Sequence, residues 1–224
     1  MAAGKGDAGE AHTALETLCR AYWRPIYFYV RRKGHGPEDA KDLTQEFFGQ
    51  LIRKEHFRFA DQTKGKFRTF LLASLDHFLA REWSRAHRQK RGGEFTFVSF
   101  DETNADDWYR VEPGDSRTPR EAYDRQWALT VLKQTMDRLE KEYKAAGKDN
   151  LFREIRHLLS GEKGGESYGD MCGRLGMAEG ALRVAIHRLR QKYAELVRCE
   201  IARTVGHPDE INEEIRFLLS VVGA

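Results

Sequence analysis

The sequence predicts an all-α protein in which two small helical domains are joined by an acidic linker. Apolar residues recur at spacings of three and four along most of the chain, which is the period of an α-helix. The chain has only 5 prolines, and runs of β-branched residues are scarce. One stretch without any period, residues 96–117, divides the predicted helices into two groups.

The first predicted domain, residues 10–95, follows a glycine- and alanine-rich N-terminus, residues 1–9, that we expect to be disordered. Its first helix ends at Gly34 and contains Pro25, where we expect a kink or a restart. Two further helices follow, the last of them over residues 67–90. Apolar periodicity in these two helices predicts core positions at Ala40, Leu43, Phe47, Leu51, Phe67, Leu71, Leu75, Phe78 and Leu79.

The second predicted domain, residues 118–205, begins with a threonine cap followed by proline, which is a typical helix start. A short helix over 167–175, a three-residue turn and a long helix over 179–205 form a predicted helix-turn-helix. An amphipathic C-terminal extension, 206–224, follows. The apolar side of that last helix is predicted to hold Ile211, Ile215, Leu218, Leu219 and Val222.

Charge is distributed unevenly although the net charge is only +3. Two helical stretches, Arg81–Arg91 and Arg183–Arg198, each hold five basic residues and one acidic residue. Between them the stretch Asp101–Asp107 holds four acidic residues and no basic one. The distribution, and not the net charge, therefore indicates contact with nucleic acid.

Several function classes lack their sequence signals. The three cysteines stand far apart and form no cluster with histidines, and we find no P-loop, dinucleotide fingerprint, HExxH motif or nucleophile elbow. We therefore expect no enzyme activity, no cofactor and no metal. Because the sequence has neither an apolar signal core nor a long apolar stretch, we expect a cytoplasmic, nucleoid-associated protein without a membrane partner.

The helix-turn-helix is the sharper of two DNA-binding candidates. Leu182, Ala185, Ile186, Leu189 and Tyr193 share one helix face and should pack inward. The outward positions are then Arg183, Val184, His187, Arg188, Arg190 and Gln191. An ordinary helical hairpin with a solvated basic face is the alternative. Ala178 stands where a serine or threonine cap is expected, at a cost of about 1 kcal/mol in helix stability.

The helix over 67–90 is the second candidate. Basic residues alternate there with aromatic ones, and this combination neutralises phosphates and stacks on unpaired bases. The alternative is that the aromatic residues belong to the core. The residues concerned are Arg68, Phe70, His77, Arg81, Trp83, Arg85 and Arg88.

An acidic helix precedes these DNA candidates. Asp39, Asp42 and Glu46 lie within helical reach of one another, together with Gln45. A helical hydrolase with a divalent metal would use such carboxylates, but no histidine or cysteine completes a ligand set. A solvated or partner-binding acidic face is the preferred interpretation.

Three segments, in this order, resemble the extracytoplasmic-function branch of the sigma-70 family. They are YWRPIYFYVRRKGHGPEDAKDLTQEFF, FRTFLLASLDHFLAREWSRAHRQKR and GMAEGALRVAIHRLR. The resemblance covers residues 12–95 and 119–203. It implies a sigma factor that binds core RNA polymerase and directs promoter recognition, DNA melting and transcription initiation, with no catalysis of its own.

The resemblance also implies partners and roles. Asp39, Asp42, Gln45 and Glu46 would bind the clamp helices of the polymerase β′ subunit. The second domain would dock on the β flap and read the −35 element of the promoter. Contacts to the −10 element would come from Phe59, Lys64, Lys66, Arg68, Phe70, His77, Arg81, Trp83, Arg85 and Arg88. Those to the −35 element would come from Glu179, Arg183, Val184, His187, Arg188 and Arg190.

Four questions stay open at this point. The acidic linker would thread through positively charged polymerase channels, or it would be a plain spacer. A stand-alone helix-turn-helix regulator that acts without polymerase is the alternative function. Control by an anti-sigma factor, by a kinase acting near Thr44, or by the C-terminal helix is equally compatible with the sequence. That helix, 206–224, exceeds the family pattern and would pack on the DNA-reading domain or serve regulation.

Overall fold

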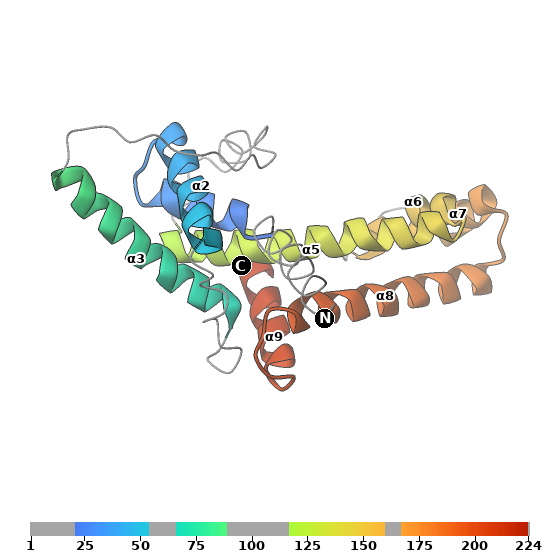
Figure 1. The fold of residues 1–224 in the computed structure, drawn as a ribbon. Coiled ribbons are helices and arrows are strands. Elements are labelled where there is room, and N and C mark those ends of the chain that lie inside the picture. The colour runs from blue at the N-terminus through green and yellow to red at the C-terminus, as the bar shows by residue number, and fades with distance from the viewer. Residues whose placement is uncertain (1–20, 54–65, 89–116, 160–166, 224) are drawn as a thin grey trace, which may run out of the picture. The chain divides into compact units, whose positions relative to one another are not determined.

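The described part of the protein is all-α, with helices joined by turns, as the apolar periods predict (Figure 1). The computed structural model describes residues 21–53, 66–88, 117–159 and 167–223, and no strand occurs within these ranges. The predicted disordered N-terminus and all of the linker except Arg117 lie outside them.

The chain forms two compact units whose boundary lies inside helix α5 (Pro119–Ala145). The sequence predicts this boundary at the linker, residues 96–117. The start of α5 belongs instead to the first unit, because Trp127 is buried there and its indole N–H donates to the Tyr22 hydroxyl (3.1 Å). Unit 1 comprises Met1–Thr130 and Thr204–Ala224, and unit 2 comprises Val131–Arg203.

A buried helical segment, 21–32, contributes much of the unit 1 core. The helix continues through Pro25 and ends before Gly34, whose φ of +97° is a conformation that favours glycine. Its side chains are buried around the whole circumference, as expected for a helix that is apolar on every side. The buried residues include Tyr22, Trp23, Ile26, Tyr27, Phe28, Tyr29 and Val30.

Helices α2 (Pro37–Arg53) and α3 (Phe67–Arg88) pack their predicted apolar faces inward. Leu43, Phe67 and Leu79 are half-buried. Ring contacts extend from one helix to the other, with the Phe47 and Phe78 centroids 5.6 Å apart. The fully buried members of the predicted set are Ala40, Phe47, Leu51, Leu71, Leu75 and Phe78.

The C-terminal helix α9 (Glu210–Gly223) belongs to unit 1 (Met1–Thr130 and Thr204–Ala224) and not to unit 2 (Val131–Arg203), so the expectation that it packs on the predicted DNA-reading domain is wrong. Leu218 is fully buried, and the Phe217 ring lies 6.2 Å from that of Trp127. Leu219, which we had placed on the apolar side, is 61% exposed. The helix instead buries Glu214, which pairs with Arg68 of α3, and Arg68 in turn pairs with Asp124 of α5.

Unit 2 is built from the second half of α5 with α6 (Asp149–Ile155), the 3-10 helix η3 (Arg156–Leu159), α7 (Tyr168–Leu175) and α8 (Glu179–Ala202). Ion pairs join these helices at the surface, for example Arg138 to Glu200 (3.2 Å). The core residues are Leu139, Phe152, Ile155, Met171, Leu182, Ile186, Leu189 and Leu196.

Local hydrogen bonds and one glycine define the two ends of α7 and the start of α8. Ser167 caps α7 by accepting a hydrogen bond from the Asp170 amide (3.2 Å). Gly176 ends α7 with a φ of +60°, and the Met177 amide donates to the Cys172 carbonyl (3.1 Å). Ala178 occupies the N-cap position of α8 without a side-chain cap bond, as predicted.

Candidate functional site

Unit 2 presents the outward face of α8 to solvent. Every residue that the sequence assigned to this face is exposed, while Leu182, Ile186 and Leu189 are buried. The helix period therefore separates core from surface as predicted. The exposed set is Glu179, Arg183, Val184, His187, Arg188, Arg190 and Gln191.

Arg183 is held by two neighbours on this face. Its guanidinium pairs with Glu179 one turn earlier (2.6 Å) and lies over the Tyr168 ring, 5.2 Å from the centroid. Hydrogen bonding to Glu179 raises the pKa of Arg183, so the guanidinium stays charged. Tyr168, His187 and Arg190 line a hollow of about 230 Å³ beside it. Tyr168 is not among the residues predicted from the sequence, and its position at the start of α7 is the signal that could indicate it.

The predicted −10 contacts on α3 differ in their exposure and in their ion pairs. His77, Arg81 and Trp83 are exposed, with Trp83 at 65%. Phe70 is half-buried, and Arg85 pairs with Glu82 (3.4 Å). Phe59 and Lys64 lie outside the described residues, as does the side chain of Arg88.

The burial of Arg68 contradicts its predicted role as a contact to the −10 element. It is 8% exposed and forms ion pairs with Asp124 of α5 (2.8 Å) and with Glu214 of α9. Burial by itself would lower the pKa of Arg68, but Glu214 and then Asp124 outweigh it and the pKa is raised. Lys66 also pairs with Glu214 (3.0 Å). Both cations pair with carboxylates inside unit 1, so the Arg68 side chain lacks the exposure that the predicted DNA contact requires.

The predicted polymerase-binding residues of α2 differ in their exposure to solvent. Asp39 and Asp42 are exposed, whereas Gln45 and Glu46 are half-buried. Glu46 faces α3, where Arg85 lies within 3.6 Å of its carboxylate. Within the described ranges, no group of three or more histidine, cysteine, aspartate or glutamate side chains is placed to hold a metal ion.

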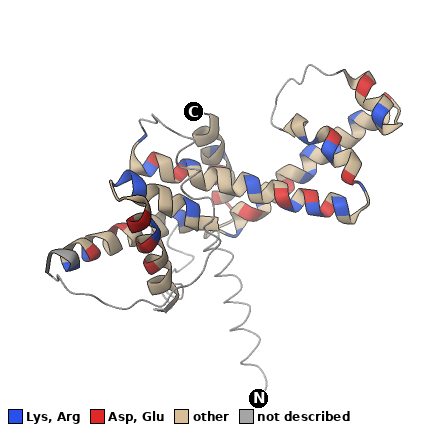
Figure 2. Cartoon of the chain, turned by 90° about the horizontal axis from the view of Figure 1, so that it is seen from above, with Lys and Arg blue, Asp and Glu red and all other residues tan. Residues whose placement is uncertain are grey.

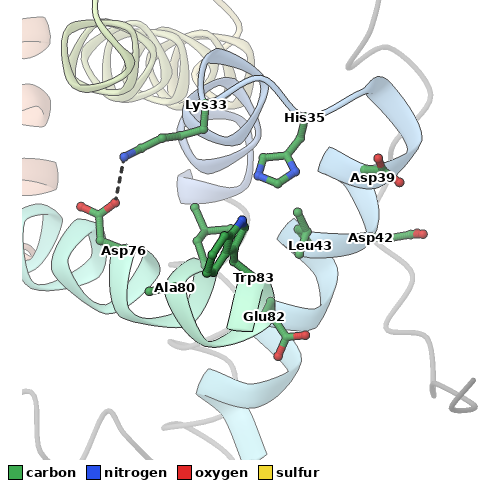
Figure 3. Close-up of a pocket in the computed structure, with 10 residues that line it drawn as sticks. Lys33, His35, Asp39, Asp42, Leu43, Asp76, Ala80, Glu82 and Trp83 are labelled. Atoms are coloured by element: carbon green, nitrogen blue, oxygen red, sulfur yellow. Dashed lines mark ion pairs between the residues drawn. The ribbon is translucent and has the colours of Figure 1, made fainter. Parts of the chain in front are cut away.

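A groove between α2 and α3 unites acidic and apolar side chains of unit 1 (Figure 3). Its volume is about 600 Å³. In Figure 3 the Trp83 side chain rises from α3 into the space beside His35 and Leu43. Lys33 pairs with Asp76 (3.5 Å), which also accepts a hydrogen bond from the Tyr29 hydroxyl (2.7 Å). The lining residues are Lys33, His35, Asp39, Asp42, Leu43, Asp76, Leu79, Ala80, Glu82 and Trp83.

The groove was not predicted from the sequence, although the sequence does show that its α3 residues share one helix face. Asp76, Leu79, Ala80 and Trp83 follow the spacing of one helix face. The rest of the groove depends on tertiary structure, because only the packing of α2 on α3 places Asp39 and Asp42 along the same groove.

Thr44 cannot serve as an accessible phosphorylation site in the folded unit. Its side chain is fully buried, and its hydroxyl donates to the Ala40 carbonyl (2.7 Å). A kinase would have to unfold α2 to reach this hydroxyl.

Comparison of the chain with protein-family models, with curated proteins and with solved structures finds no match. The resemblance to sigma factors therefore rests on the sequence motifs. In the part of the chain that the structure describes, none of the helices is both long and apolar enough to cross a membrane.

Proposed function

We propose that this protein is a sigma factor that binds core RNA polymerase through unit 1 and reads promoter DNA through the helix-turn-helix of unit 2. The observation that most supports the proposal is the geometry of α7 and α8. An 8-residue helix, a turn at a left-handed glycine and a 24-residue helix with an exposed basic face match the requirements for docking in a major groove.

The DNA-reading role falls to the cations on α8. Arginine forks onto guanine edges or holds phosphates, and Arg183, Arg188 and Arg190 are exposed on this helix. Charges of both signs are interspersed along the helices of the protein (Figure 2). Few phosphates would be neutralised by so small a basic surface, so the free protein should bind DNA weakly.

The polymerase-binding role falls to Asp39 and Asp42 on the exposed edge of α2. Acidic side chains on a helix surface suit a basic protein partner and repel nucleic acid. The opposite charges of this edge and of the α8 face support a division of labour between the two units.

In vitro transcription with purified core polymerase and a candidate promoter tests the proposal. We expect core binding and initiation to depend on this protein. Tight binding to duplex DNA in a gel shift without polymerase would favour the stand-alone regulator instead, and a failure to bind core would refute the sigma assignment.

Two variants separate the proposed roles. Asp39→Lys with Asp42→Lys should abolish core binding and leave helicity intact. Arg183→Ala with Arg188→Ala should spare core binding and weaken promoter use by about 1–3 kcal/mol per base contact. Equal losses in both assays from both variants would contradict the division of labour.

A further inference from the structure

The exposed Trp83 lies in a strongly acidic setting. The residues that line its groove include four carboxylates, from Asp39, Asp42, Asp76 and Glu82, but only Lys33 as a permanent cation. Moreover, the Lys33 ammonium lies 3.5 Å from Asp76 and 5.2 Å from the centre of the Tyr29 ring. Lys33 and Asp76 therefore neutralise each other, and Glu82 pairs with Arg85 (3.4 Å), so the remaining negative charge of the lining comes from Asp39 and Asp42.

This charge conflicts with the role that the sequence suggested for Trp83. A nucleotide whose base stacks on the indole would bring its phosphate toward the carboxylates that line the groove, and these negative charges would repel each other. A cationic partner gains from the same carboxylates. The apolar side chains that line the groove are those of Leu43, Leu79, Ala80 and Trp83.

We infer that the groove between α2 and α3 is a docking site for a basic amphipathic helix of a protein partner, with Trp83 as its central contact. Such a helix would place apolar side chains on Trp83 and Leu43 and arginine or lysine side chains against Asp39 and Asp42. Tryptophan is among the residues that most often dominate interface energies, and a helix in an apolar groove is a recurrent recognition mode. The inference rests on the proposed function, because Asp39 and Asp42 also belong to the proposed polymerase-binding surface.

The first test uses the full-length protein and three labelled probes in fluorescence anisotropy. One is a synthetic helical peptide with leucines along one face and arginines along both edges. The second has glutamates in place of the arginines, and the third is a short oligothymidylate. We expect the arginine peptide to bind at least about tenfold more tightly than the glutamate peptide.

Variants locate the binding site. Trp83→Ala and Asp42→Lys should each lower the affinity for the arginine peptide by about tenfold or more. Trp83→Ala should leave the affinity for oligothymidylate unchanged. Leu219→Ala is the matched control, since Leu219 is also a large apolar residue, 61% exposed, and lies outside the groove. This control should change none of the three affinities.

The inference is overturned if neither peptide binds, if both bind equally, or if Trp83→Ala weakens oligothymidylate and spares the arginine peptide. The last result would return Trp83 to the DNA surface. None of these outcomes depends on polymerase. Core binding of the wild-type protein, measured separately, decides the proposed function, so the two can fail independently.

Discussion

Removal of the Glu214 carboxylate should destabilise unit 1 far more than its position near the C-terminus indicates. Glu214 is 1% exposed and receives two hydrogen bonds from the Arg68 guanidinium, through Nε and through Nη2 (3.5 Å). The Arg68 guanidinium also lies 3.9 Å from the centre of the Phe217 ring. Glu214→Ala would leave the buried Arg68 guanidinium paired with Asp124 but without the Glu214 carboxylate.

The size of the effect follows from the remaining partner. Breaking a buried ion pair by removing one member costs about 3–5 kcal/mol. Arg68 keeps Asp124 at 2.8 Å, so we expect a loss of about 3 kcal/mol, at the lower end of this range. Replacement of the whole triad by apolar residues, Arg68→Met with Asp124→Leu and Glu214→Leu, leaves no buried charge and should cost less than about 1 kcal/mol.

Urea denaturation followed by tryptophan fluorescence measures this loss in unit 1 selectively. All 4 tryptophans of the chain lie in the part of the sequence that belongs to this unit, Met1–Thr130. Glu213→Ala is the matched control. Its carboxylate is 66% exposed and pairs with Lys66 (3.3 Å), so its removal should change the unfolding free energy by less than about 1 kcal/mol.

Two results would refute this reasoning. One is a loss below about 1 kcal/mol for Glu214→Ala, which would mean that the cation is solvated or repaired by neighbours. The other is a triple variant as unstable as the single one. In that case the ion pairs would contribute net stability, and an unpaired charge would not be the cause.

Three further perturbations test local conclusions. Gly176→Ala, at a φ of +60° and with open space around the added carbon, should cost unit 2 about 1–2 kcal/mol in urea denaturation followed by far-UV circular dichroism. Gly173→Ala, inside α7 with equally open space, should add about 1 kcal/mol, and two changes of the same sign would contradict the conformational argument. Ala178→Ser should supply the missing cap of α8 and add about 1 kcal/mol, whereas Ala194→Ser inside the same helix should not stabilise. Burial raises the pKa of Tyr123 well above its usual value, so above about pH 10 the unfolded chain loses this proton first and the stability of unit 1 falls as pH rises. Tyr123→Phe should make that fall shallower by up to about 1.4 kcal/mol per pH unit, and an unchanged slope would refute the linkage.

Much of the local structure was predictable because it depends on short stretches of chain. Thr118 forms a capping box in which its amide donates to the Glu121 carboxylate (2.7 Å). Gly176 and Ala178 occupy the turn and cap positions expected of them. The inward and outward faces of α8 also follow from a period that no tertiary contact alters.

The errors concern charged residues whose environment depends on distant segments. Arg68 resembles a surface cation in a basic helix, and Glu214 resembles a polar residue on an amphipathic one. They meet although 146 positions separate them in the chain. A local pattern cannot reveal that two opposite charges will compensate each other's burial.

The sequence by itself determined the helical class, the two helices α7 and α8 with the turn between them, and the acidic edge of α2, since each follows from spacing and local chemistry. The tertiary structure decided where the charges are used. Packing of α9 against α3 and α5 withdrew Arg68 from the surface, and packing of α2 on α3 placed Trp83 among carboxylates. Side-chain burial and electrostatic neighbours arise from contacts between segments, so they became visible only in the folded units.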